Sequence, residues 1–158
     1  MAEHALRPVD DAFLLSAPIV VRSSVDLDAS PDRVWAALGS DEMWSWLPVI
    51  DRLEWLTPRP YAAGSVRRLR LGRLVTVDEE FYRWDEGDRA TFRVVAQSRP
   101  VLDAMAEDFL LVPKGPRTTL IWTMALAPRR GASLPLGFLG PLLRPGNALA
   151  IGGIRRIL

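Results

Sequence analysis

The chain has 158 residues, no cysteine and a single histidine, His4. Without cysteine it can form neither disulfides nor thiolate metal sites, and this composition fits a reducing compartment such as the cytoplasm. One histidine near the N-terminus leaves none for a catalytic triad, a histidine general base or a histidine metal site in the rest of the chain. The sequence therefore predicts no metal site and a cytoplasmic location.

Neither sign of charge dominates, since 20 basic residues balance 19 acidic ones and the net charge is +1. Such a chain has no overall field that would attract nucleic acid or an anionic membrane. An apolar stretch at residues 134–143 is broken by prolines and glycines and falls short of the ~20 residues that a membrane span needs. We expect no nucleic-acid partner and no stable membrane insertion. The glycine-rich segments match no phosphate-binding or dinucleotide-binding motif, so no cofactor is predicted.

The length and the hydrophobic content of 49% suit a single domain with a sizeable core. Residues 1–17 lack the charged-then-apolar order of a signal peptide and contain only a brief apolar run. They are predicted to form a partly ordered tail. The domain itself is expected to cover residues 18–158.

The segment from Val21 to Pro48 carries the clearest local signals. Apolar residues alternate over residues 21–28, which predicts a half-buried strand. Ser30 and Pro31 then suit the N-cap and first position of a helix that ends near Gly39. A second short, tryptophan-rich helix is expected before Pro48.

Further strands are predicted by alternation and by turn residues between them, at residues 50–56, 65–71, 75–84, 90–97, 105–112 and 118–126. Together with the first strand they make about seven, all antiparallel, in an α+β domain. A helix is expected beyond Pro145, with Leu149 or Ala150, Ile154 and Ile157 facing inward. Its glycines favour either close helix packing or a weak helix that opens to admit a ligand.

Four short patterns occur in a characteristic order: VDLDASPDRVWAAL, the W-x-W-L-P turn at Trp44–Pro48, FYRWDEGDRATF, and TTLIWTMAL. In these the chain resembles the START-like (SRPBCC) superfamily, polyketide cyclase/dehydrase-type branch. The resemblance implies a helix-grip fold, in which a curved antiparallel sheet wraps around a C-terminal helix and leaves a cavity for an apolar ligand. It does not imply one activity.

Within the hairpin at Gly72, a three-residue loop would place Leu71 opposite Val75, Leu69 opposite Val77 and Arg67 opposite Glu79. A two-residue turn would instead pair Arg67 with Asp78. We favour the three-residue loop because it keeps one face of both strands apolar. Arg67 and Glu79 then lie among apolar neighbours, either as a buried structural ion pair or as groups that orient a ligand.

The predicted ligand-binding residues share the inner face of the sheet: Arg67, Leu69, Leu71, Val77, Glu79, Phe81, Leu120, Trp122 and Met124. Trp122 can equally be an ordinary core residue. If the protein is an enzyme, Glu79 is the candidate acid or base and Arg67 polarises a carbonyl, with Tyr82 and Glu107 as weaker candidates.

Three functions stay open from the sequence. The first is binding or carriage of a small hydrophobic molecule such as a lipid, isoprenoid or polyketide, which the resemblance implies. The second is a cyclase or dehydratase, less favoured because the cavity would lack histidine. The third is an interaction module in which the apolar residues 134–143 dock onto a partner protein or a second copy of the chain. The oligomeric state is expected to be a monomer or a homodimer.

Overall fold

The computed structural model of the protein describes residues 4–131 and 140–158, with side chains described from residue 146 onward in the last helix. The elements follow in the order β1 (His4–Ala5), α1 (Phe13–Ser16), β2 (Ile19–Leu27), α2 (Pro31–Leu38), β3 (Ile50–Trp55), β4 (Val66–Leu71), β5 (Val75–Asp85), β6 (Arg89–Gln97), β7 (Leu102–Lys114), β8 (Arg117–Pro128), α3 (Gly140–Gly152) and a 3-10 turn, η2 (Gly153–Arg156).

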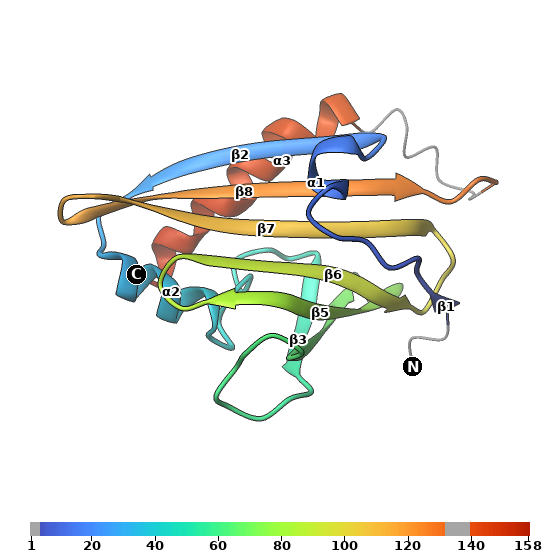
Figure 1. Ribbon diagram of the computed structural model, residues 1–158, viewed down its shortest axis with the longest axis horizontal. Coiled ribbons are helices and arrows are strands. Elements are labelled where there is room, and N and C mark those ends of the chain that lie inside the picture. The colour runs from blue at the N-terminus through green and yellow to red at the C-terminus, as the bar shows by residue number, and fades with distance from the viewer. Residues whose placement is uncertain (1–3, 132–139) are drawn as a thin grey trace.

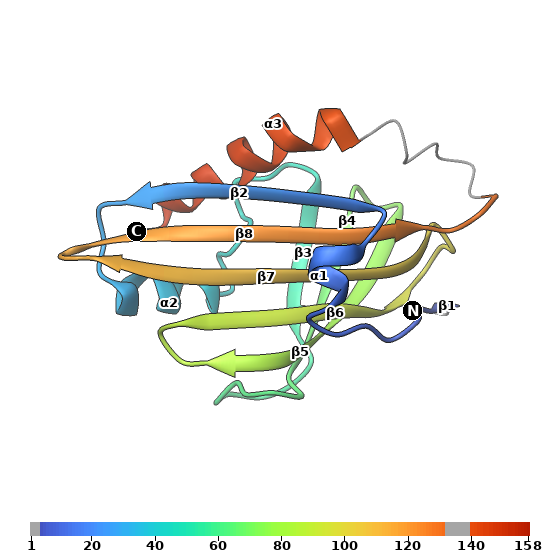
Figure 2. The same cartoon turned by 45° about the horizontal axis from the view of Figure 1, so that its top comes forward.

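One antiparallel sheet organises the molecule, with the strand order β2-β8-β7-β6-β5-β4-β3 (Figure 1). Consecutive strands pair as hairpins from β3 to β8, while β2 closes the sheet against β8. The sheet curls, so that β3 and β4 lie behind the long strands (Figure 2). Helix α3 lies along the inner face and contacts β2. The predicted α+β helix-grip architecture is confirmed.

Helix α2 begins where the sequence indicates. The Ser30 hydroxyl accepts a hydrogen bond from the Arg33 amide at 3.5 Å, and Pro31 occupies the first turn. The prediction of a second short helix after β2 is wrong. Residues 41–46 form successive turns instead, because Trp44 takes a positive φ of 71°, which no regular helix contains.

The N-terminal segment lies on the outer face of the sheet, opposite α3 (Figures 1 and 2). Strand β1 pairs with β6, and Val9, Phe13 and Leu14 are buried. They cover four alanines that share this face of β7 and β8: Ala104, Ala106, Ala125 and Ala127. From residue 4 this segment packs on the sheet, because small side chains on two long strands leave a shallow apolar surface for it.

Helix α3 begins at Gly140, ahead of the start predicted beyond Pro145, and includes Pro145. Of the two alternatives predicted to face inward, Ala150 packs against the core and Leu149 is 79% exposed. Ile154 is buried as predicted, and Ile151, which the prediction did not include, is buried too. The Trp46 indole Nε1 donates to the Ala150 carbonyl at 2.7 Å and joins the helix to the turns after α2.

No helix within the described residues is long and apolar enough to cross a membrane. Residues 132–139, which hold most of the apolar stretch that an interaction module would use, lie outside the described residues. The interaction hypothesis and the oligomeric state therefore stay predictions.

Candidate functional site

The β4–β5 hairpin builds one wall of the site, and its register is the predicted one. Leu71 pairs with Val75, Leu69 with Val77 and Arg67 with Glu79. Gly72 and Arg73 both take positive φ in the loop, which allows the three-residue turn. The hairpin thus presents one apolar face to the interior, with the charged pair further along it.

Arg67 and Glu79 form a buried ion pair, with 1% and 7% of their side chains exposed. The Arg67 Nε and Nη2 atoms both donate to Oε2 of Glu79, at 2.8 and 2.5 Å. The guanidinium is also within 5.5 Å of the ring centroids of Trp55, Phe81 and Phe92. Aromatic faces and a carboxylate therefore replace the water that Arg67 loses on folding.

Beside this pair lies a cavity of about 250 Å³. Its walls are mostly apolar and come from the inner face of the sheet and from the turns after α2: Trp44, Leu47, Ile50, Leu69, Leu71, Val75, Val77, Glu79, Val94, Gln97, Val101, Leu102, Met105, Glu107, Trp122 and Met124. The sequence predicts a cavity between the sheet and the C-terminal helix. Among the described side chains, the wall facing the sheet comes from Trp44 and Leu47 instead.

Six of the predicted ligand-binding residues line this cavity: Leu69, Leu71, Val77, Glu79, Trp122 and Met124. Three predicted residues do not line it. Phe81 and Leu120 are closed into the core, and Arg67 lies behind Glu79. The assignment of ligand contact to these nine residues stays a prediction.

The two weaker acid–base candidates lie on opposite faces of the sheet. Tyr82 lies on the outer face, as the favoured register of the hairpin predicts, with the Arg93 guanidinium 5.5 Å from its ring centroid, and it does not line the cavity. Glu107 points inward from β7. It lines the cavity, and its Oε2 accepts a hydrogen bond from the Trp122 indole at 2.7 Å. Strand parity decides both outcomes.

Glu107 has a strongly perturbed carboxyl group that lines this cavity. Burial raises its pKa to about 8, and the negative charge of Glu79 adds to the rise. The hydrogen bond from Trp122 and the positive charge of Arg67 act in the opposite direction. At neutral pH the Glu107 carboxyl is therefore mostly protonated and can donate a hydrogen bond into the cavity.

Glu79 has a different environment. Burial also raises its pKa, but the charge and the hydrogen bonds of Arg67 lower it. Both Arg67 donors use Oε2, so the other carboxylate oxygen of Glu79 has no hydrogen-bond partner within residues 4–131 and 146–158. The cavity thus combines a neutral donor with a carboxylate whose charge is balanced by Arg67, a pairing that can orient a polar group of a ligand or move a proton.

Sequence reasoning missed most of the remaining lining. Val94, Gln97, Val101, Leu102 and Met105 come from β6, β7 and the turn between them. Met105, Glu107 and Phe109 lie two residues apart along β7 and therefore share one face of the sheet, a pattern from which Met105 could have been predicted. The residues around the β6–β7 turn show no such alternation. The Gln97 side chain is held there by hydrogen bonds with the backbone of Leu102, at 2.7 and 3.2 Å, which the sequence does not indicate.

No group of three or more His, Cys, Asp or Glu residues in the described ranges is arranged to hold a metal ion. His4 belongs to β1, where it pairs with Gln97 at the edge of the outer face. Among the described residues, the ionisable groups that line the cavity are Glu79 and Glu107, and Arg67 reaches it only through its bonds to Glu79.

Residues 18–156 match a family model described as polyketide cyclase / dehydrase and lipid transport. An uncharacterized protein of Mycobacterium tuberculosis strain H37Rv is 32% identical over 148 residues, which are 92% of this chain and 87% of that protein. Uncharacterized proteins of M. tuberculosis strain CDC 1551 and Mycobacterium bovis match equally.

Solved structures share the fold. A START superfamily protein from Mycobacterium smegmatis superposes with a TM-score of 0.67 at 18% identity, covering 89% of this chain and 99% of that one. The Zhui aromatase/cyclase from Streptomyces sp. R1128 gives a TM-score of 0.61 at 20% identity, covering 85% and 82%. At these identities the likeness concerns the fold alone.

Proposed function

Since the chain belongs to the polyketide cyclase / dehydrase and lipid transport family, we propose that it binds a small, largely apolar molecule in the cavity beside Glu79 and Glu107. The predicted membership of the START-like superfamily, in its polyketide cyclase/dehydrase-type branch, is confirmed by this family match. The observation that carries the proposal is the cavity itself, with apolar walls and one buried neutral donor.

Cavity size limits the ligand. A volume of about 250 Å³ lies just below the usual range for small-molecule pockets. A dry apolar cavity of about 150 Å³ holds one benzene molecule. The cavity of this chain therefore suits a compact molecule of one or two rings or a short isoprenoid, and it disfavours a long-chain lipid or a tetracyclic compound.

The polar groups specify a further feature. A protonated Glu107 needs an acceptor, because a buried donor without a partner costs about 1–3 kcal/mol. A ligand carbonyl or hydroxyl oxygen next to Glu107 would supply that acceptor. We expect a molecule with an apolar body and one oxygen atom placed toward the β5–β7 side of the cavity.

Native mass spectrometry of the purified protein, followed by organic extraction, tests for a ligand that is retained. Calorimetric titration then compares 2-acetonaphthone with naphthalene and palmitic acid. We expect 2-acetonaphthone to bind roughly threefold to tenfold more tightly than naphthalene, the range that one hydrogen bond provides. Palmitic acid should not bind.

A matched pair of variants locates the binding. Leu71→Trp fills the cavity and should abolish binding of 2-acetonaphthone, whereas Leu74→Trp lies at the exposed tip of the same hairpin and should not. Equal affinity in the two variants would contradict the assignment of this cavity. Failure to extract or bind any apolar compound would leave the proposal without support.

A second candidate is an aromatising dehydratase, favoured by two carboxyl groups that share one cavity in different environments. Glu107 would protonate a leaving hydroxyl, which departs as water, and Glu79 would remove the proton from the adjacent carbon. Glu107 is then the acid, because its pKa of about 8 keeps it mostly protonated at neutral pH, whereas Glu79 is paired with the Arg67 guanidinium.

The dehydration of 3-hydroxy-1-tetralone to 1-naphthol and water tests this candidate, since 1-naphthol is fluorescent. Glu107→Gln should abolish turnover while it retains affinity for 2-acetonaphthone. Asp103→Asn, an exposed change on the same strand, serves as the control. Turnover that survives in Glu107→Gln would exclude Glu107 as the acid.

A further inference from the structure

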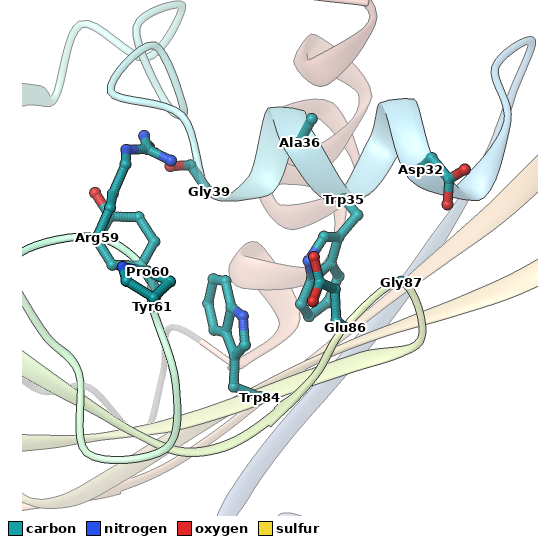
Figure 3. Close-up of a pocket in the computed structure, with 10 residues that line it drawn as sticks. All are labelled: Asp32, Trp35, Ala36, Gly39, Arg59, Pro60, Tyr61, Trp84, Glu86 and Gly87. Carbon is teal, nitrogen blue, oxygen red and sulfur yellow. Dashed lines mark hydrogen bonds between the residues drawn. The ribbon is translucent and has the colours of Figure 1, made fainter.

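A second hollow of about 770 Å³ opens at the other end of the inner face. It lies between α2, the loop at Arg59–Tyr61 and the β5–β6 turn (Figure 3). It shares no lining residue with the cavity that holds Glu79 and Glu107. The two hollows are therefore distinct, and a ligand of the second can bind whether or not the first takes an apolar molecule. We call this second hollow the aromatic pocket.

The walls of the aromatic pocket are aromatic faces set at steep angles. The Trp35 and Trp84 ring centroids are 4.9 Å apart with planes inclined by 60°. Tyr61 meets Trp84 edge-on, at 5.8 Å and 81°. The rings contact one another, so that a ligand meets only the parts of their surfaces that line the pocket, and the ring faces among these carry negative π potential.

Two carboxylates face the same space. Asp32 comes from the first turn of α2 and Glu86 from the β5–β6 turn, and both are exposed. The two segments lie close together, since a Cβ atom on Gly87 would be 3.9 Å from Oδ1 of Asp32. Neither carboxylate has an ion-pair or hydrogen-bond partner in residues 4–131 and 146–158, whereas Asp85, in the same turn as Glu86, pairs with Arg83.

The one cationic side chain that lines the aromatic pocket, within the described part of the chain, is already engaged. Arg59 donates from Nη2 to the Gly39 carbonyl at 3.0 Å, and its guanidinium lies 4.7 Å from the centroid of Tyr61. It therefore covers the Tyr61 end of the pocket. The Trp35 and Trp84 end, with its two carboxylates, has no cation among the described residues (Figure 3).

From this arrangement we propose that the aromatic pocket binds an alkylated ammonium group, which contacts the pocket-facing surface of the Trp35–Trp84 pair and lies beside the Asp32 and Glu86 carboxylates. Methyl groups on the nitrogen match the apolar ring faces, and the positive charge is spread over those groups, so that it needs no directed hydrogen bond. The carboxylates raise the local concentration of cations and disfavour anions.

The test uses the full chain, labelled with 15N, and follows the indole N–H signals of Trp35 and Trp84 during titration with choline chloride. The neutral isostere 3,3-dimethyl-1-butanol has the same shape without the charge, and sodium chloride controls for ionic strength. We expect choline to shift both signals saturably with a Kd in the millimolar range, and the isostere to bind roughly tenfold more weakly.

Two double variants distinguish the effect of the carboxylates that line the pocket from the effect of carboxylates elsewhere on the surface. Asp32→Asn with Glu86→Gln should weaken choline binding roughly tenfold. Glu42→Gln with Asp88→Asn removes the same charge from exposed positions that do not line the pocket, and should leave the affinity unchanged. The absence of a saturable shift, equal affinity for the isostere, or equal loss in both double variants would each overturn the proposal. Competition between choline and 2-acetonaphthone is not expected, since the two hollows are separate.

Discussion

Glu107 combines burial, an indole donor and a neighbouring carboxylate, and its ionisation therefore responds to pH more than that of an exposed glutamate. Its ordinary pKa of 4.5 is raised to about 8 by burial and by the charge of Glu79. Between these two values the folded protein holds a proton that the unfolded chain releases. Stability contributed by a group that binds a proton only in the folded state must fall as the pH rises.

We predict that the free energy of unfolding decreases between about pH 5 and pH 8, by at most about 1.4 kcal/mol per pH unit from this group. Glu107→Gln keeps an acceptor for Trp122 and cannot ionise, so its stability should fall less steeply. Urea unfolding at several pH values measures both curves. Parallel curves for the two proteins would show that Glu107 titrates normally.

Arg67 gives a second prediction at this scale. Arg67→Met leaves Glu79 buried without its partner and should lower the free energy of unfolding by roughly 3–5 kcal/mol. Replacing both residues with apolar ones should recover much of the loss. Chemical denaturation of the wild type, the two single variants and the double variant measures the coupling.

Arg68 is the matched control for Arg67. It is adjacent in β4, pairs with Asp78 at 2.6 Å, and has 33% of its side chain exposed on the opposite face. Arg68→Met should cost less than Arg67→Met, because this bidentate pair is only partly buried and Asp78 can still reach water when Arg68 is removed. Equal losses at Arg67 and Arg68 would contradict the special role of burial. A stable double variant that no longer binds 2-acetonaphthone would assign the Arg67 pair to ligand binding.

Among the elements, the junction of α3 and η2 depends on one glycine. A Cβ atom on Gly153 would lie 2.1 Å from Cδ1 and Nε1 of Trp46, an overlap that requires the indole to move. That indole also donates to the Ala150 carbonyl. Close packing therefore accounts for Gly153, in line with the first of the two interpretations of the glycines in this helix.

Gly153→Ala should destabilise the protein by about 1–3 kcal/mol through overpacking. Gly152→Ala is the matched control, because its Cβ would meet only the flexible end of Arg155, at 3.5 Å. That change should be neutral or stabilise by up to about 1 kcal/mol. Thermal unfolding of both variants measures the difference. Similar melting temperatures would mean that Trp46 adapts without cost.

In the whole molecule, the sheet is covered on both faces, with α3 on the inner face and the N-terminal segment on the outer one. The outer cluster is small and separate from the main core. Its contribution should therefore be to stability alone, with no effect on the cavity beside Glu107.

Phe13→Ala should lower the free energy of unfolding by about 3 kcal/mol, the lower end for a buried phenylalanine. Leu15→Ala, in the same short helix but 89% exposed, should change it by less than about 0.5 kcal/mol. Affinity for 2-acetonaphthone should be the same in both variants. A loss of affinity in Phe13→Ala, measured well below its melting temperature, would show that the two faces are coupled.

Local sequence determined the strands, the cap of α2 and the register of the β4–β5 hairpin. Alternation fixes which side chains share a face, and the loop at Gly72 fixes the pairing of Arg67 with Glu79, so both can be derived from neighbouring residues. The four family patterns predicted the helix-grip fold, because they follow one another in the family's order along the chain.

Tertiary structure alone decided the rest. The pairing of β7 with β8 brings Glu107 to Trp122, and the curl of the sheet brings it into the field of Glu79, which no local pattern indicates. The positive φ of Trp44 and the burial of Phe13 likewise depend on packing against strands distant in sequence. Periodicity along the chain predicts which residues of a strand share a face. The cavity, its charges and the segments that cover each face of the sheet depend on contacts between strands and helices distant in sequence.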